Sequence, residues 1–184
     1  MLTGMIALLI LAAVVVPDEG TAELPVCVPA PSDEKVGTNS ALDEHRMLRR
    51  ALAEPMPDAP MMVMLHGKGG HLSTEEYSII LARDADGHWR SSAVGRSQIG
   101  VAGAPFIPMK RQDWVLDQAN ARRLESVISR TCPRDRKSTS SANSGPPPDY
   151  ITETIDIIVA GHTTTSFFVS DESAQLAALV RPPQ

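Results

Sequence analysis

Apolar and polar positions alternate along two stretches of the chain, and a period of two predicts a β-hairpin in each. The first stretch is "EEYSIILARDADGHWRSSAV", where "DADG" supplies a turn and Gly87 can adopt a positive φ. The second is "YITETIDIIVAGHTTTSFFVS", which turns at Ala160, Gly161 and His162. The run "MMVML" predicts a further strand. The positions on one face are Tyr77, Ile79 and Leu81 in the first hairpin and Ile151, Ile155, Ile157 and Val159 in the second.

Apolar residues at helical spacing follow each hairpin. The helix in "LDQANARRLESVISRTC" has Asp117 as its N-cap and stops at Pro133. The last helix begins after the cap Ser170 and stops at Pro182. A short surface helix is expected earlier in the chain, in "NSALDEHRMLRRALAEP", with Ser40 as its N-cap.

Because each hairpin precedes a helix, the predicted fold class is α+β. We expect an antiparallel sheet built from two hairpins, with two helices packed on one face, plus a short N-terminal helix. The segment "GRSQIGVAGAPFIPMKRQDW" is expected to be a long loop that packs Phe106, Ile107 and Trp114 onto the sheet. The polar residues 133–149 predict a mobile loop.

The amino terminus carries an apolar run of twelve residues, Met5–Val16. A helix needs about 20 residues to span a bilayer, so we interpret residues 1–22 as a signal peptide that is cleaved after Ala22. No Lys or Arg precedes the run, and an uncleaved anchor or a buried segment are the alternatives. Residues 23–60 are then a linker with the short helix, and residues 61–184 form one periplasmic or secreted α+β domain.

The two cysteines, Cys27 and Cys132, are predicted to form a disulfide after export. Such a bond closes a loop of about 105 residues and is worth about 4 to 5 kcal/mol in the chain-entropy model. A cytosolic protein would instead hold two free thiols. The sequence before Cys27 lacks the small residue that a lipoprotein signal needs.

Charge excludes one large class of partner. The net charge is -5 and the basic residues are scattered, whereas a nucleic-acid-binding protein needs a concentrated basic surface. One group of arginines lies in and just after the helix predicted for "LDQANARRLESVISRTC", and it suits either a solvated surface or an acidic partner. These are Arg122, Arg123, Arg130, Arg134 and Arg136.

The glycine-rich stretch "LHGKGGHLS" does not match a known catalytic loop. An α/β-hydrolase also needs a G-x-S-x-G elbow, and the nearest stretch, "GRSQI", ends in Ile99. A phosphate loop needs Ser or Thr after its lysine, but Gly69 follows Lys68. The chain therefore offers no catalytic residue that we would assign.

Metal binding is the remaining chemical hypothesis. His66 and His71 could converge across the turn, and His88 could join them if the first strand lies beside "HWR". The alternative is a pair of exposed turn histidines that flank conformationally free glycines. Calcium is disfavoured because Ala82 and Ala93 occupy ligand positions of the EF-hand pattern. We assign no metal and no cofactor, and keep the three histidines as candidates.

The order "YSIILARDADGHW", loop, helix, "ITETIDIIVAG", short turn, strand and C-terminal helix resembles a family of uncharacterised bacterial exported α+β domains, many of them lipoproteins. The resemblance covers residues 61–180. It implies a fold and an exported location, and it implies no activity. The lipoprotein cysteine common in that family is absent.

These observations predict an exported, non-enzymatic binding or structural protein of the bacterial periplasm or cell envelope. Its partner would be an unknown protein or another envelope component, not a nucleic acid, and it would meet the membrane only through its signal sequence. One alternative is a metal-binding protein or metal-dependent enzyme that uses His66, His71 and His88. Another is an inhibitor-like or assembly module that pairs through a sheet edge.

Overall fold

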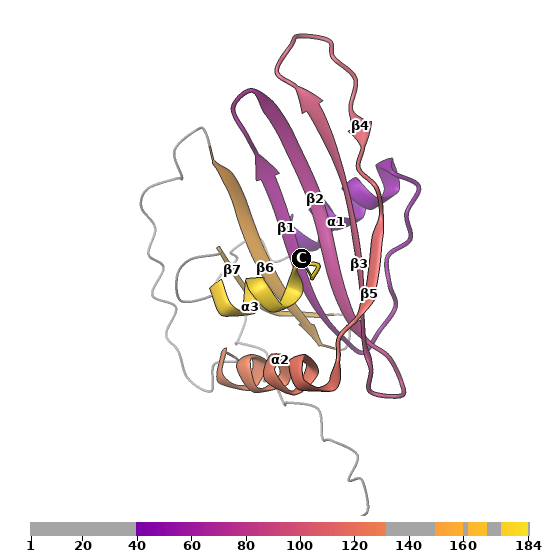
Figure 1. The fold of residues 1–184 in the computed structure, drawn as a ribbon, viewed down its shortest axis with the longest axis vertical. Helices are drawn as coiled ribbons and strands as arrows, with labels where there is room; N and C mark the ends of the chain where they lie inside the picture. The colour runs from indigo at the N-terminus through magenta and orange to yellow at the C-terminus, as the bar shows by residue number, and fades with distance from the viewer. Residues whose placement is uncertain (1–39, 132–149, 160–161, 169–173, 184) are drawn as a thin grey trace, which may run out of the picture.

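The computed structural model describes residues 40–131, 150–159, 162–168 and 174–183. These residues form three helices and seven strands (Figure 1). The helices are α1 (Ser40–Ala51), α2 (Gln118–Thr131) and α3 (Ala174–Val180). The strands are β1 (Met61–Gly69), β2 (Ser73–Arg83), β3 (Trp89–Ile99), β4 (Ile107–Pro108), β5 (Gln112–Val115), β6 (Ile151–Val159) and β7 (His162–Phe168).

The strands form one antiparallel sheet in the order β4-β3-β2-β1-β6-β7, and β5 also pairs with β3. The fold is mixed α+β, as predicted. The sheet is more than two hairpins, because β1 lies between them and pairs with both β2 and β6. The predicted "MMVML" strand therefore becomes the centre of the sheet, and it continues through the glycine-rich stretch to Gly69.

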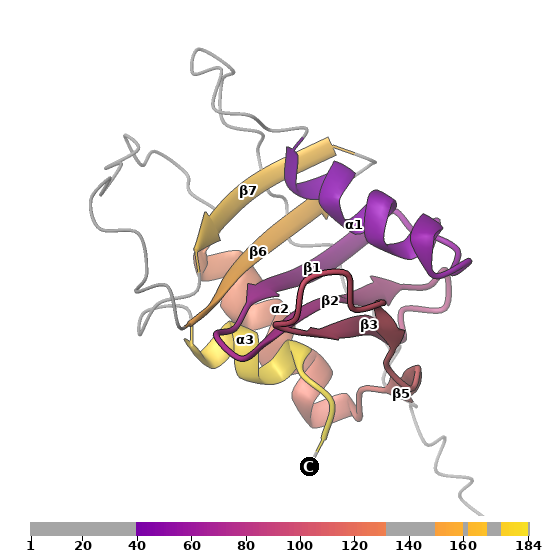
Figure 2. The ribbon, with the colours of Figure 1, turned by 90° about the horizontal axis from the view of Figure 1, so that it is seen from above.

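Alternation along β1 divides the core into two. Met61, Val63 and Leu65 point to one face, where they pack with Leu124 of α2 and Leu176 of α3 in one apolar cluster. Figure 2 shows α2 and α3 together on this side of the sheet. All five of these side chains are buried, so this cluster is the main core.

The opposite face is covered by α1, which lies alone on its side of the sheet in Figure 2. Met62 and Met64 of β1 pack there with Ile80, and Leu42 of α1 lies against them. Leu48 of α1 is also buried. Residues 40–60, which the sequence pattern assigned to a linker, thus contribute a helix that packs on the sheet, and the domain has three layers.

Local signals in the sequence predicted two features correctly. Gly87 has a φ of 83°, and the Asp84 carboxylate accepts a hydrogen bond from the His88 amide at 2.8 Å, which closes the turn between β2 and β3. Asp117 caps α2, because its carboxylate accepts from the Asn120 amide at 2.8 Å.

The segment expected to be one long loop, residues 95–114, instead includes the end of β3, all of β4 and most of β5, and its expected packing is wrong in part. Trp114 packs against the main core, as expected. Phe106 and Ile107 do not reach the core: Ile107 lies in β4 at the edge of the sheet and the Phe106 ring lies against Arg96 of β3, and both side chains remain exposed. The reason is that β3 runs on to Ile99 and carries the following chain past the end of the core.

Several predictions lie outside the described residues. They are the signal peptide, the loop at residues 133–149 with Arg134 and Arg136, both partners of the predicted disulfide, Cys27 and Cys132, the turn at Ala160 and Gly161, and the cap Ser170. Among the helices that the structure describes, none has the length and apolar character needed to cross a bilayer.

Candidate functional site

The three candidate metal ligands occupy different parts of the fold. His66 is buried in β1 beneath α1, on the face opposite the main core. His71 lies in the exposed turn between β1 and β2, and His88 lies in the turn at the other end of β2. No group of three metal-ligating side chains suited to an ion occurs in the described part of the chain. The structure therefore does not bring these histidines together.

The glycines of "HGKGG" have a structural explanation. The Tyr77 ring lies across Gly67, its partner in the β1–β2 register, so a Cβ at Gly67 would overlap the ring. Gly70 has a φ of 119°, and a Cβ there would overlap the carbonyl oxygen of Ser73. The Tyr77 hydroxyl donates to the Glu153 carboxylate, which also binds Arg181. These glycines thus allow close packing, and they do not form a ligand cradle.

A buried polar layer between α1 and the sheet is the first candidate site. The Ser78 hydroxyl lies 2.7 Å from Nδ1 of His45 and accepts a hydrogen bond from Nε of Arg49 at 2.9 Å. The His45 and His66 rings meet edge to face, with centroids 5.4 Å apart. His45, Arg49 and Ser78 are at most 1% exposed. Sequence analysis missed this layer because it treated α1 as a surface helix.

Arg49 carries most of the hydrogen bonds in this layer. Its guanidinium donates to the carbonyl oxygens of Pro55 at 3.1 Å and Ser92 at 2.9 Å, and to the Ser92 hydroxyl at 3.1 Å. Burial lowers its pKa to about 10, and the nearby charge of Arg111 adds to that effect. The side chain stays charged at neutral pH. Its hydrogen bonds therefore connect α1 to β2 and β3 through a buried cation.

Both histidines of the layer are held neutral. Burial lowers the pKa of His45 well below its ordinary value, and the neighbouring His66 and Arg49 lower it further. Burial also lowers the pKa of His66, although Glu44 and Glu76 oppose that change. Nε2 of each ring is buried without a hydrogen-bond partner. A positive charge on the His45 ring would therefore be poorly accommodated, whereas the His66 ring has the carboxylates of Glu44 at 3.2 Å from Nδ1 and Glu76 at 3.6 Å from Nε2.

Glu76 closes the layer on the side of β3. Its carboxylate accepts from Nε of Arg96 at 2.8 Å and lies 3.5 Å from the Lys68 ammonium. Burial works to raise the pKa of Glu76, but the hydrogen bond from Arg96 and the charge of Lys68 outweigh it, so the pKa is lowered. The carboxylate is thus ionised and fully engaged.

This layer does not have the properties of a catalytic site. A nucleophile must reach its substrate, but the Ser78 side chain is 0% exposed and its oxygen is already bound by Arg49. The layer fixes α1 to the sheet instead.

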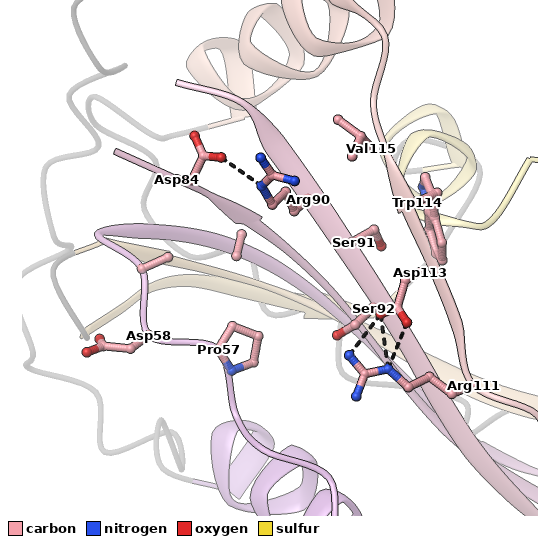
Figure 3. Close-up of a pocket in the computed structure, with 12 residues that line it drawn as sticks. Pro57, Asp58, Asp84, Arg90, Ser91, Ser92, Arg111, Asp113, Trp114 and Val115 are labelled. Atoms are coloured by element: carbon pink, nitrogen blue, oxygen red, sulfur yellow. Dashed lines mark hydrogen bonds and ion pairs between the residues drawn. The ribbon is translucent and has the colours of Figure 1, made fainter. Parts of the chain in front are cut away.

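The second candidate is an open groove of about 490 Å³ beside β3 and β5 (Figure 3). Its polar wall includes two ion pairs: Arg90 with Asp84 at 2.8 Å, and Arg111 with Asp113 at 2.9 Å. Each arginine thus already binds a carboxylate, whereas the carboxylate of Asp58, which also lines the groove, makes no ion pair with a described residue. Trp114 and Val115 also line it. No reactive group and base converge among its lining residues.

The third candidate is an exposed apolar surface at one end of the sheet, where the β1–β2 turn lies next to the chain from β3 to β4. We call it the apolar tip. Leu72 is 82% exposed, Val101 64% and Ile107 57%. Single exposed apolar side chains are common on protein surfaces, but groups of them are uncommon and mark interaction surfaces. The members of the apolar tip are Leu72, Ile99, Val101, Phe106, Ile107 and Met109.

The apolar tip is held in place by hydrogen bonds. The Gly100 amide donates to the Leu72 carbonyl at 2.8 Å, which joins the two turns. The Met109 amide donates to the Gly95 carbonyl at 2.8 Å, which returns the chain to β3. The Arg96 guanidinium lies 4.1 Å from the centroid of the Phe106 ring. The surface is therefore preformed before any partner arrives.

Comparison with known proteins gave no match to a protein-family model, to a curated protein or to a solved structure. The function must therefore be inferred from the chain's own residues.

Proposed function

We propose that this protein is an exported, non-enzymatic binding protein of the bacterial cell envelope, which attaches to its partner through the apolar tip. The observation that carries the proposal is the preformed cluster of exposed side chains around Val101 and Ile107. Burying side chains of this kind stabilises a complex by about 1.5 to 3 kcal/mol each, and a rigid surface loses little entropy on binding.

Export is supported by the leader and by the cysteine pair. Residues 1–22 have the apolar run and small residues of a signal peptide. Cys27 and Cys132 are suited to an oxidising compartment.

An assembly role through the β3 side of the sheet has less support. The β3 edge is partly occupied, since β4 pairs with Arg96 and Ser97 and β5 pairs with residues 90–93. Short covering strands of this kind protect an edge from a further strand. The apolar tip is the better candidate for attachment.

Fractionation of the producing cells tests the proposal. The double variant Val101→Asp with Ile107→Asp is compared with the wild type and with Val115→Asp, whose side chain is similarly exposed but lies on β5. We expect the wild type and Val115→Asp to remain with the washed envelope and the double variant to be released. Each protein is also analysed by mass spectrometry, and each should begin after Ala22. Equal retention of the tip variant, or an intact Met1, would contradict the proposal.

A further inference from the structure

We propose that the partner of the apolar tip is the surface of an anionic phospholipid bilayer. This inference rests on the proposed function, because it names the envelope component that the apolar tip would meet. It departs from the expectation that only the signal sequence contacts the membrane. Three independent features of the described residues support it.

The first feature is the length of chain without a polar side chain. From Ile99 to Met109 the sequence reads "IGVAGAPFIPM", and all of these residues except Ala104 are exposed. Leu72 extends the same surface from the neighbouring turn. A protein interface usually includes polar side chains that give specificity. Insertion into the acyl region of a bilayer instead becomes more favourable with the apolar area that is buried.

The second feature is the state of the backbone. A chain that enters a bilayer must satisfy its own amide groups. The Gly100 and Met109 amides are bonded as described above, and the amides of Val101 and Ala104 donate to the carbonyls of Ile99 at 2.7 Å and Val101 at 3.0 Å. Pro105 and Pro108 have no amide proton to satisfy. The amides of Ala102, Gly103 and Phe106 are the ones in this turn that have no hydrogen bond to a described residue.

The third feature is a group of four basic side chains at the base of the apolar tip. Three of them have carboxylate partners, which are Glu76, Asp113 and Glu54. Lys110 directly follows the apolar run, is exposed and makes no ion pair with any described residue. Basic side chains beside an inserting surface are attracted to anionic lipid headgroups. We call these residues the basic collar: Lys68, Arg96, Lys110 and Arg111.

Tyr150 adds to this arrangement. It is 66% exposed and immediately precedes Ile151, which pairs with Gly69 beside the β1–β2 turn. Tyrosine is favoured at the level of the headgroups because its ring is apolar and its hydroxyl is polar. The geometry thus points to shallow insertion, with the apolar tip among the acyl chains and the basic collar and Tyr150 at the headgroups.

Tryptophan fluorescence can test this at a single position. Phe106→Trp places a reporter on the apolar tip, and Val115→Trp places a matched reporter on β5; the two native tryptophans, Trp89 and Trp114, pack in the main core of both variants. Each full-chain protein is mixed with vesicles of equal parts phosphatidylcholine and phosphatidylglycerol, with bromine on the acyl chains. The quenching at position 106 reports insertion of the apolar tip whether or not the leader is present.

We expect vesicles to shift the emission of Phe106→Trp to the blue and to quench it, and to leave Val115→Trp unchanged. Adding Val101→Asp to Phe106→Trp should weaken the partition at least about tenfold. Raising the salt concentration, or omitting phosphatidylglycerol, should weaken it as well. The melting temperatures of the variants confirm that each is folded.

Three results would overturn the inference. They are an absence of quenching at position 106, equal quenching at both positions, and self-association of the protein through the apolar tip without vesicles. If quenching is absent but the tip variant is still released from the envelope, the partner is a protein and the proposed function stands. If neither assay depends on the apolar tip, the proposed function fails too.

Discussion

At the scale of single residues, two buried histidines make stability depend on pH. The folded protein holds His45 and His66 with lowered pKa values, while the unfolded chain titrates them near the ordinary value of about 6.5. Above that value both states are neutral and the histidines add no pH dependence. Below it the unfolded chain binds protons that the folded protein does not, so the free energy of unfolding falls by up to about 1.4 kcal/mol per histidine per pH unit.

Urea denaturation between about pH 7 and about pH 5 measures this loss and avoids the range in which carboxylates titrate. The His45→Gln variant should lose part of the pH dependence, whatever its stability at neutral pH. His88→Gln changes an exposed histidine in the β2–β3 turn and should keep the full dependence. An unchanged slope in His45→Gln would show that the buried ring does not cause the effect.

The close approach at Gly67 gives a second residue-scale prediction. A Cβ at this position would overlap the Tyr77 ring, which is held by the Glu153 carboxylate. Gly67→Ala should therefore lower the free energy of unfolding by about 1 to 3 kcal/mol, the usual cost of overpacking. In the Tyr77→Leu background the same change should cost less, because the ring is gone. If the losses in the free energy of unfolding simply add in the double variant, the Tyr77 ring does not cause the strain at position 67.

At the scale of elements, the sequence predicted the helix starts and turns that depend on residues close together in the chain. Asp117 and Gly87 acted through atoms within four residues, so the start of α2 and the β2–β3 turn were predictable. The central place of β1 and the docking of α1 depend on contacts between distant segments, such as Arg49 with Ser78. The apolar tip was visible as "IGVAGAPFIPM", but nothing local showed that Phe106 and Ile107 would lie beyond the core.

The docking of α1 can be tested through its buried arginine. Arg49→Met keeps the length of the side chain but leaves the carbonyl oxygens of Pro55 and Ser92 without their donor. A buried acceptor that loses its donor costs about 1 to 3 kcal/mol. We expect a loss of that order in denaturant unfolding, with faster amide exchange in α1 than in α2. Arg50→Met, at the next and exposed position, is the control and should change stability by less than about 0.5 kcal/mol.

At the scale of the whole molecule, the predicted export and the predicted disulfide depend on each other. The bond between Cys27 and Cys132 would restrict a loop of about 105 residues, and its loss would cost about 4 to 5 kcal/mol before any strain is subtracted. A reducing agent should therefore lower the melting temperature of the purified protein, and Cys27→Ser with Cys132→Ser should melt at that lower temperature with or without the agent. Alkylation under native conditions supplies the second measurement: the exported protein should be labelled at neither cysteine. The prediction is contradicted if both cysteines are labelled and the reducing agent leaves the melting temperature unchanged. The two thiols would then be free, and the cysteine pair would no longer support export.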